Sequence, residues 1–109
     1  MNLQIRWTPV ALQSLSEVLE YTFGEFGESQ LRKLINQIYA VVRRVEVFPF
    51  LGKQETELIE ATGVEYRSAV VIKEIKLLYT IVDDTIFIEF IKNTRLDDAT
   101  MLAKLNESC

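Results

Sequence analysis

Five charged residues in the C-terminal half have the types and spacing needed for chemistry on a phosphate group. Cationic side chains can stabilise the negative charge that develops as a phosphodiester bond is cleaved, and the candidates are Arg67, Lys76 and Arg95. A carboxylate can take the proton from the attacking hydroxyl, and the weaker candidates for this base are Glu65 and Glu89. The sequence contains no histidine, so the base would have to be one of these carboxylates or an uncharged Lys76.

Three apolar stretches place most of these residues on consecutive strands. They run from about Val64 to Ile72, from Ile75 to Val82 and from Thr85 to Asn93, and they are rich in the β-branched and aromatic residues typical of strands. The pairs Lys73-Glu74 and Asp83-Asp84 separate them. This spacing predicts an antiparallel meander with two tight turns.

The predicted strands also divide their side chains between two faces. Because side chains alternate along a strand, the more apolar set of each strand is predicted to face the core, including Tyr79 in the middle strand and Ile86, Ile88 and Phe90 in the third. The polar set would then gather on the opposite surface as a candidate site: Glu65, Arg67, Lys76, Thr80, Glu89, Asn93 and Arg95.

The N-terminal half predicts a strand and two helices. Residues 3–7 alternate apolar and polar side chains, which indicates a short strand at an edge of the sheet. Thr8 followed by Pro9 is a common helix start, and the apolar spacing after it predicts a helix that ends near Gly24. After a connector that ends at Gly27, a second helix is expected from about Glu28 to Val45, antiparallel to the first.

The remaining segments are expected to be a turn, a loop and a short helix. Residues 48–53 read FPFLGK, and we expect the proline and glycine to form a turn whose two phenylalanines join Trp7 in the core. Residues 54–63 are polar and predict a surface loop that includes at most one helical turn. Asp97 or Asp98 is expected to cap a short final helix. The predicted fold class is α+β, with a four-stranded antiparallel sheet and an N-terminal two-helix hairpin packed on one face, in the order β-α-α-β-β-β and then the short helix.

Composition limits the kinds of function. The length of 109 residues indicates one domain over 1–109. The lone cysteine, Cys109, cannot form an intrachain disulfide, so a reducing cytoplasm is the expected location. We expect Asp83-Asp84 to serve a turn and Asp97-Asp98 a helix start rather than a metal ion, and no phosphate-binding glycine loop or Cys/His cluster points to a cofactor. No apolar run is long enough to predict a membrane span.

The charge is unevenly distributed along the chain. The net charge is −4, and residues 55–109 carry eleven acidic and six basic side chains, whereas residues 1–54 carry five and six. An acidic half matches a phosphate backbone poorly. Any nucleic-acid function would therefore depend on a local basic patch.

Several motifs in a fixed order give the chain a family resemblance. They are the WTPxAxxxL helix start at Trp7, the FPxxGK turn at Phe48, the YR pair at Tyr66, the LLYxIxDDxI hairpin from Leu77 to Ile86, and the TRxD ending at Thr94. Together they resemble the RelE/ParE superfamily of type II toxins, also described as plasmid stabilisation proteins, over roughly residues 3 to 98. The long helical pair and the ending near Arg95 look more like the ParE branch.

The resemblance implies a toxin that inhibits growth and is neutralised by a cognate antitoxin. A ParE-like toxin binds DNA gyrase, whereas a RelE-like toxin is a metal-independent endoribonuclease that cuts mRNA on the ribosome. In the RelE branch basic residues of the sheet stabilise the scissile phosphate, and Arg67, Lys76 and Arg95 fall on or beside matching positions. The sequence departs from that pattern, because Glu65 replaces a basic residue and Asn93 stands where many ParE-like sequences have histidine. The resemblance leaves open a non-toxic relative that only binds antitoxin, and a homodimer or a heterotetramer with antitoxin.

Overall fold

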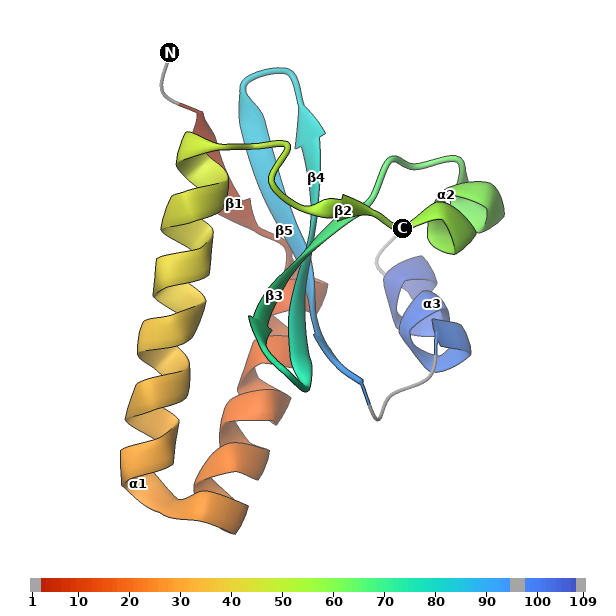
Figure 1. Cartoon of the computed structure of the whole chain (residues 1–109). Coiled ribbons are helices and arrows are strands. Elements are labelled where there is room, and N and C mark those ends of the chain that lie inside the picture. The colour runs from red at the N-terminus through yellow and green to blue at the C-terminus, as the bar shows by residue number, and fades with distance from the viewer. Residues whose placement is uncertain (1–2, 95–97, 108–109) are drawn as a thin grey trace.

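The computed structural model describes residues 3–94 and 98–107. The chain forms the strand β1 (Gln4–Trp7), the long helical segment α1 (Pro9–Val47), the two-residue strand β2 (Lys53–Gln54) and the short helix α2 (Thr56–Thr62). A meander of β3 (Arg67–Ile72), β4 (Ile75–Val82) and β5 (Thr85–Asn93) follows, and α3 (Asp98–Glu107) comes last. Figure 1 shows α1 folding back on itself as two antiparallel arms beside the sheet.

The sequence explains where α1 starts and where it turns. The Thr8 hydroxyl accepts a hydrogen bond from the amide of Ala11 at 3.0 Å, and Pro9 occupies the first turn, as predicted. The first arm continues past the predicted end at Gly24. The chain reverses at Gly27, whose φ of 84° and ψ of −176° interrupt the helix. Those dihedral angles are accessible almost only to glycine, so a two-helix hairpin is present with its turn at the second of the two predicted glycines.

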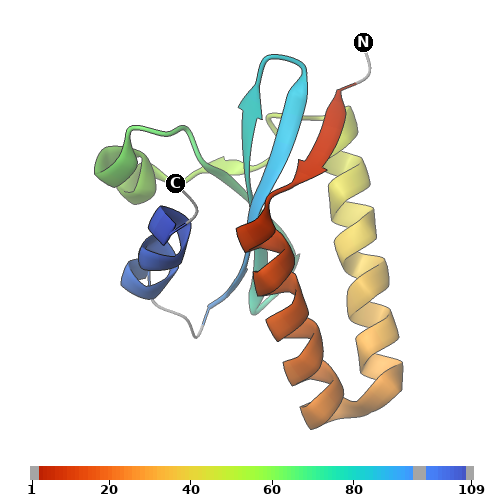
Figure 2. The ribbon, with the colours of Figure 1, turned by 180° about the vertical axis from the view of Figure 1, so that it is seen from behind.

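The sheet has five strands in the order β1-β5-β4-β3-β2 and is mixed, which corrects the expected four-stranded antiparallel sheet. The meander of β3, β4 and β5 is antiparallel as predicted, but β1 pairs with β5 in parallel (Figure 2). The additional strand β2 pairs with β3 at the far edge. Two residues of strand are too short to produce a detectable alternation in the sequence.

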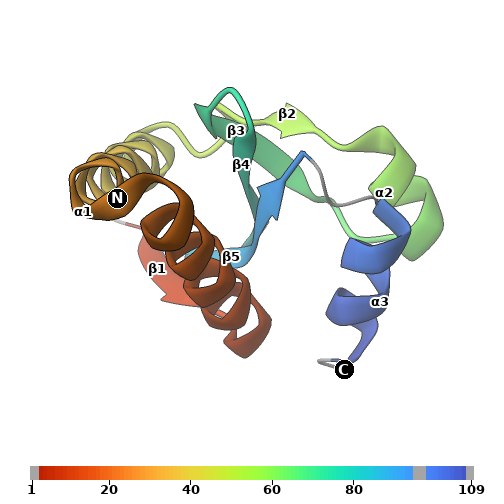
Figure 3. The ribbon, with the colours of Figure 1, turned by 90° about the horizontal axis from the view of Figure 1, so that it is seen from below.

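Helices cover both faces of the sheet (Figure 3). Each face has its own apolar core. The larger core lies between the arms of α1 and the sheet and includes Val18, Leu34, Leu77, Tyr79 and Ile88. The second core lies on the other face under α2 and α3 and consists of Leu58, Tyr66, Leu78, Phe90, Met101 and Leu105. An ion pair of 3.3 Å between Lys104 and Glu17 also connects α3 to the first arm of α1. No helix within the described residues is long and apolar enough to span a membrane.

A β-bulge in β5 changes which side chains reach each core. Leu78 pairs with Phe90, but the next residue of β4, Tyr79, pairs with Ile88, so Glu89 is an extra residue in β5. Beyond the bulge Phe90 enters the second core, whereas Ile91 enters the core under α1. The predicted grouping of Phe90 with Ile86 and Ile88 is therefore wrong, because strict alternation holds only up to the bulge.

Candidate functional site

Arg67 lies on the face of the sheet that α1 covers. It pairs directly with Tyr79, and directly paired residues of antiparallel strands project to the same face. Tyr79 is fully buried in the core under α1. The Arg67 guanidinium reaches the rim of this core, where Nη1 donates to the carbonyl of Gly52 at 2.9 Å and more weakly to that of Phe50 at 3.4 Å. It also stacks on the Phe50 ring, 5.0 Å from the ring centre.

Lys76 lies on the opposite face of the sheet. It pairs with Val70 and Lys92, and its neighbour two residues along β4, Leu78, enters the second core. The expected common surface for Arg67 and Lys76 is therefore not formed. The prediction failed because it assumed one covered face. Because helices cover both faces of the sheet, both faces carry apolar side chains. The alternation of side chains in β3 therefore does not indicate which face Arg67 lies on.

Glu89 is a half-buried carboxylate at the bulge of β5. Its Oε2 accepts a hydrogen bond from the Thr80 hydroxyl at 2.8 Å, which places it on the face that also carries Lys76. Burial raises the pKa of Glu89 above its usual value, and the hydrogen bond from Thr80 opposes this shift in part. A carboxyl group with a raised pKa holds its proton to a higher pH than an exposed glutamate does.

The other predicted site residues are dispersed. Glu65 is exposed and precedes β3, which starts at Arg67 and not at Val64. Asn93 pairs with Ile75 on the face that α1 covers, again because of the bulge. Arg95 lies outside the described residues.

The described residues do not assemble a centre for phosphodiester cleavage. Lys76 and Thr80 are four residues apart on β4, about 13 Å at the usual rise per residue. The backbone of Lys76 is therefore far from the Glu89 carboxylate, which accepts a hydrogen bond from Thr80. Arg67 is on the other face. Within residues 3–94 and 98–107 no cluster of three or more metal-ligating side chains occurs either. The catalytic roles of Arg67, Lys76, Arg95, Glu65 and Glu89 remain predictions.

A polar network that the sequence did not predict fixes the turn after α1. The Tyr79 hydroxyl donates to the carbonyl of Pro49 at 2.7 Å and accepts from the amide of Gly52 at 2.8 Å. The turn holds its aromatic side chains outward, with Phe48 64% and Phe50 71% exposed. The expectation that both belong to the core is wrong. The signal for this network in the sequence is a tyrosine in the middle of an apolar strand. A buried tyrosine hydroxyl usually has a hydrogen-bond partner, so Tyr79 predicts a polar contact.

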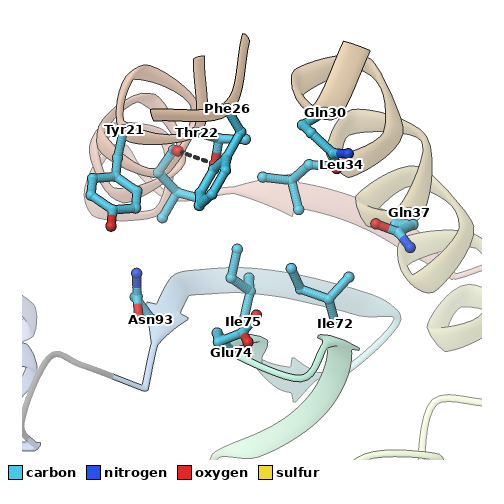
Figure 4. Close-up of a pocket in the computed structure, with 11 residues that line it drawn as sticks. Tyr21, Thr22, Phe26, Gln30, Leu34, Gln37, Ile72, Glu74, Ile75 and Asn93 are labelled. Atoms are coloured by element: carbon cyan, nitrogen blue, oxygen red, sulfur yellow. Dashed lines mark hydrogen bonds between the residues drawn. The ribbon is translucent and has the colours of Figure 1, made fainter. Parts of the chain in front are cut away.

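A cleft of about 270 Å³ opens between the turn of the α1 hairpin and the end of the sheet where β3 meets β4. Figure 4 shows Phe26, Gln30 and Leu34 of α1 facing Ile75 and Asn93 of the sheet across it. Its lining combines apolar side chains with amide groups. The cleft lies on the face that α1 covers, so Lys76 does not contribute to it.

The fold and its motifs define a toxin of the RelE/ParE superfamily. Residues 5–96 match the family model described as the ParE toxin of the type II toxin-antitoxin system parDE. The match covers most of the chain, which therefore belongs to the ParE toxin family. A search of curated proteins finds no match.

Solved toxin structures share the fold. A chain of the chromosomal ParDE toxin-antitoxin system from P. aeruginosa superposes with a TM-score of 0.67 at 16% identity, over 84% of this chain and 95% of that one. The YoeB dimer from Staphylococcus aureus gives 0.57 at 20% identity, over 84% and 97%. A chain of the heterotetrameric YoeB-YefM toxin-antitoxin complex from the same species gives 0.50 at 24% identity, again over 84% and 97%.

Proposed function

We propose that this protein is a ParE-like toxin that inhibits growth by binding DNA gyrase in the cytoplasm and is neutralised by a cognate antitoxin. The observation that carries this choice within the superfamily is the location of Arg67 and Lys76 on opposite faces of the sheet. Two cations on separate faces cannot stabilise one developing phosphate charge. A mechanism of growth inhibition that depends on binding a protein needs no such pair.

The antitoxin is the better supported of the two partners. Family membership assigns the chain to a toxin-antitoxin system, and the similar folds include toxins solved together with antitoxin, YoeB-YefM among them. Gyrase as the target follows from the ParE branch, and the acidic C-terminal half agrees with a protein target rather than an RNA target.

A reaction with purified components tests the gyrase target. The chain is added to gyrase, ATP and relaxed plasmid, and we expect supercoiling to fall and cleaved plasmid to appear after denaturation of trapped gyrase. Chain premixed with antitoxin is the matched control and should restore supercoiling. Unchanged supercoiling together with ribosome-dependent cutting of mRNA would reverse the assignment.

One observation favours a RelE-like endoribonuclease as the second candidate. Glu89 is a carboxyl with a raised pKa on the same face as Lys76, so one side of the sheet carries both a base and a cation, although Lys76 lies about 13 Å along β4 from Thr80, the hydrogen-bond partner of Glu89. This mechanism predicts that Glu89→Gln and Lys76→Ala each abolish mRNA cutting without unfolding the protein. Intact mRNA after incubation of the wild-type chain with translating ribosomes would refute it.

A relative that binds antitoxin without being toxic remains a separate hypothesis. Induced expression of the chain in the absence of antitoxin distinguishes it, because normal growth would support this reading and contradict both toxic mechanisms.

A further inference from the structure

The cleft beside the turn of the α1 hairpin, which we call the hairpin cleft, is bounded by three parts of the chain (Figure 4). Its lining comes from the first arm of α1, from the second arm and from the end of the sheet around Ile72, Glu74 and Ile75. Its volume of about 270 Å³ lies just below the range of about 300–1,000 Å³ that is usual for ligand pockets. A molecule that fills it is therefore small.

The apolar part of the lining belongs to the core under α1. Val18, Leu34 and Ile75 line the cleft and are otherwise almost fully buried, with exposed fractions of 8%, 3% and 5%. Because these side chains are packed in the core, the wall that they form is present before any ligand binds. The apolar stem of a ligand can displace water from this wall, which favours binding.

Two partly exposed aromatic rings also line the hairpin cleft. Tyr21 and Phe26 are 41% and 63% exposed, and both belong to the first arm of α1. Their ring centres are 6.4 Å apart and their planes meet at 75°, which is the edge-to-face arrangement that aromatic pairs prefer. The face of an exposed aromatic ring attracts a cation, so these rings favour a positively charged ligand.

The charge of the lining also favours a cation. Among the eleven described residues of the lining there is one carboxylate, that of Glu74, and no lysine or arginine, although Lys73 precedes Glu74 in the same turn. Within residues 3–94 and 98–107, the side chains of Glu74, Gln30 and Gln37 have no hydrogen-bond or ion-pair partner. The turn itself is fixed, because the carbonyl of Glu74 accepts a hydrogen bond from the amide of Thr94 at 2.9 Å. A carboxylate in such a position attracts a cationic ligand and repels a phosphate or a carboxylate.

We propose that the hairpin cleft binds a small organic cation, an amine or a guanidine that carries one positive charge on an apolar stem. The Glu74 carboxylate pairs with the cation, Tyr21 and Phe26 present their rings to it, and the apolar wall contacts the stem. Neither Arg67 nor Lys76 lines the cleft. The proposal therefore goes beyond the proposed function and does not depend on it.

Three ligands with the same stem and different charge test the proposal on the full chain. At pH 7 hexylamine is a cation, hexanol is neutral and hexanoate is an anion. Nuclear magnetic resonance titration follows the side-chain amide signals of Gln30 and Gln37 and the methyl signals of Ile72 and Ile75. We expect hexylamine to shift these signals with a Kd of about 1 mM or tighter. Hexanol should bind about 5- to 10-fold more weakly, and hexanoate should leave the signals unchanged.

Variants of the lining and matched controls locate the site. Glu74→Gln should raise the Kd of hexylamine about 5- to 10-fold and leave that of hexanol unchanged, and Phe26→Ala should raise the Kd of hexylamine about 3- to 5-fold. Glu60→Gln removes an exposed carboxylate from α2, and Phe23→Ala truncates a ring that is 56% exposed on the same arm but outside the lining. Both controls should leave Kd within twofold. All four side chains are exposed, so the variants should stay folded, which circular dichroism verifies.

Three outcomes would overturn the proposal. If hexanoate binds as tightly as hexylamine, or if Glu74→Gln leaves the Kd of hexylamine within twofold, the cleft does not select a cation. If hexylamine shifts signals only in another apolar region, such as the groove that Trp7 and Tyr39 line between the arms of α1, the site is elsewhere. If a capped Gly-Arg-Gly peptide binds at the same residues at least tenfold more tightly than hexylamine, the ligand is an arginine side chain of a protein rather than a free amine. The gyrase reaction is independent of all three, so each proposal can fail without the other.

Discussion

The Tyr79 hydroxyl lies 2.8 Å from the amide nitrogen of Gly52, and this hydrogen bond connects the centre of the sheet to the turn after α1. The same oxygen donates to the carbonyl of Pro49. The carbonyl of Pro49 and the amide of Gly52 are therefore both satisfied by one side chain, which lies 30 and 27 residues further along the chain. The conformation of the turn, and with it the orientation of Phe48 and Phe50, depends on this oxygen.

Tyr79→Phe should destabilise the protein by about 1–3 kcal/mol at neutral pH. The substitution keeps the buried ring but leaves the amide of Gly52 and the carbonyl of Pro49 without their partner, and an unsatisfied buried group costs about that much. Urea denaturation measures the change. Tyr39→Phe is the matched control, because Tyr39 is 68% exposed and should show almost no effect. Equal stabilities of wild type and Tyr79→Phe would mean that the turn is not held by this hydroxyl.

The same substitution should change how stability depends on alkaline pH. Burial raises the pKa of Tyr79 above its usual value of 10.0, although the Gly52 hydrogen bond and the Arg67 charge act in the opposite direction. The stabilisation is complete below pH 10 and is lost as the pH rises through the higher folded-state pKa, since the unfolded chain ionises first. Denaturation at pH 9 to 11 should show a fall for the wild type that is smaller in Tyr79→Phe.

Gly52→Ala should destabilise the protein through steric overlap. A Cβ at residue 52 would lie 2.6 Å from the Tyr79 hydroxyl oxygen and 2.9 Å from the carbonyl oxygen of Ser68, closer than carbon and oxygen can approach without movement. Overpacking of this kind costs about 1–3 kcal/mol. Gly24→Ala is the control, because its Cβ would meet nothing within 4 Å in a helix, where alanine is favoured by about 0.5–1 kcal/mol. In thermal unfolding, the Tm of Gly52→Ala should fall below that of the wild type and the Tm of Gly24→Ala should rise above it.

Glu89→Gln should raise stability at neutral pH and raise it less near pH 4. The glutamine oxygen can still accept the Thr80 hydrogen bond, but the cost of burying a charge disappears. Burial raises the pKa of Glu89 above 4.5 in the folded protein, so the unfolded chain releases its proton first and stability falls as the pH rises from about 4.5 through the folded-state pKa. Urea denaturation between pH 4 and 8 measures the difference. A Glu89→Gln variant that loses stability equally at every pH would show that the carboxylate is not penalised.

Local signals in the sequence were enough to predict the main elements. The hydroxyl of Thr8 before Pro9 started α1 as expected, the apolar spacing marked both arms, and Asp83-Asp84 formed the turn between β4 and β5, where Asp83 has a positive φ of 55°. Each of these features depends on residues close together in the chain. The motif order likewise identified the superfamily, which the ParE family match confirms.

The candidate site could not be predicted because it depends on contacts between distant segments. Alternation along a strand gives two sets of side chains but does not say which set faces α1. With α2 and α3 on the second face, Leu78 is buried there instead of facing solvent, and Phe90 lies on that face rather than on the face of Tyr79. The bulge at Glu89 also moves the side chains that follow it to the opposite faces. The sequence has no glycine or other turn-forming residue at this point that would predict a bulge.

Gly27→Ala should destabilise the α1 hairpin by about 1–3 kcal/mol, although the site has room for the methyl group. A Cβ there would meet nothing within 4 Å, so the cost comes from the backbone, whose φ of 84° and ψ of −176° disfavour any residue with a side chain. Thermal unfolding with Gly24→Ala as control checks this, because that position has ordinary helical geometry three residues earlier. The strain should also shift the two arms that flank the cleft of Figure 4, and chemical shifts of Phe26 and Gln30 would report it. If Gly27→Ala stabilises the protein as Gly24→Ala does, the turn accepts an alanine conformation and glycine is not what reverses the chain.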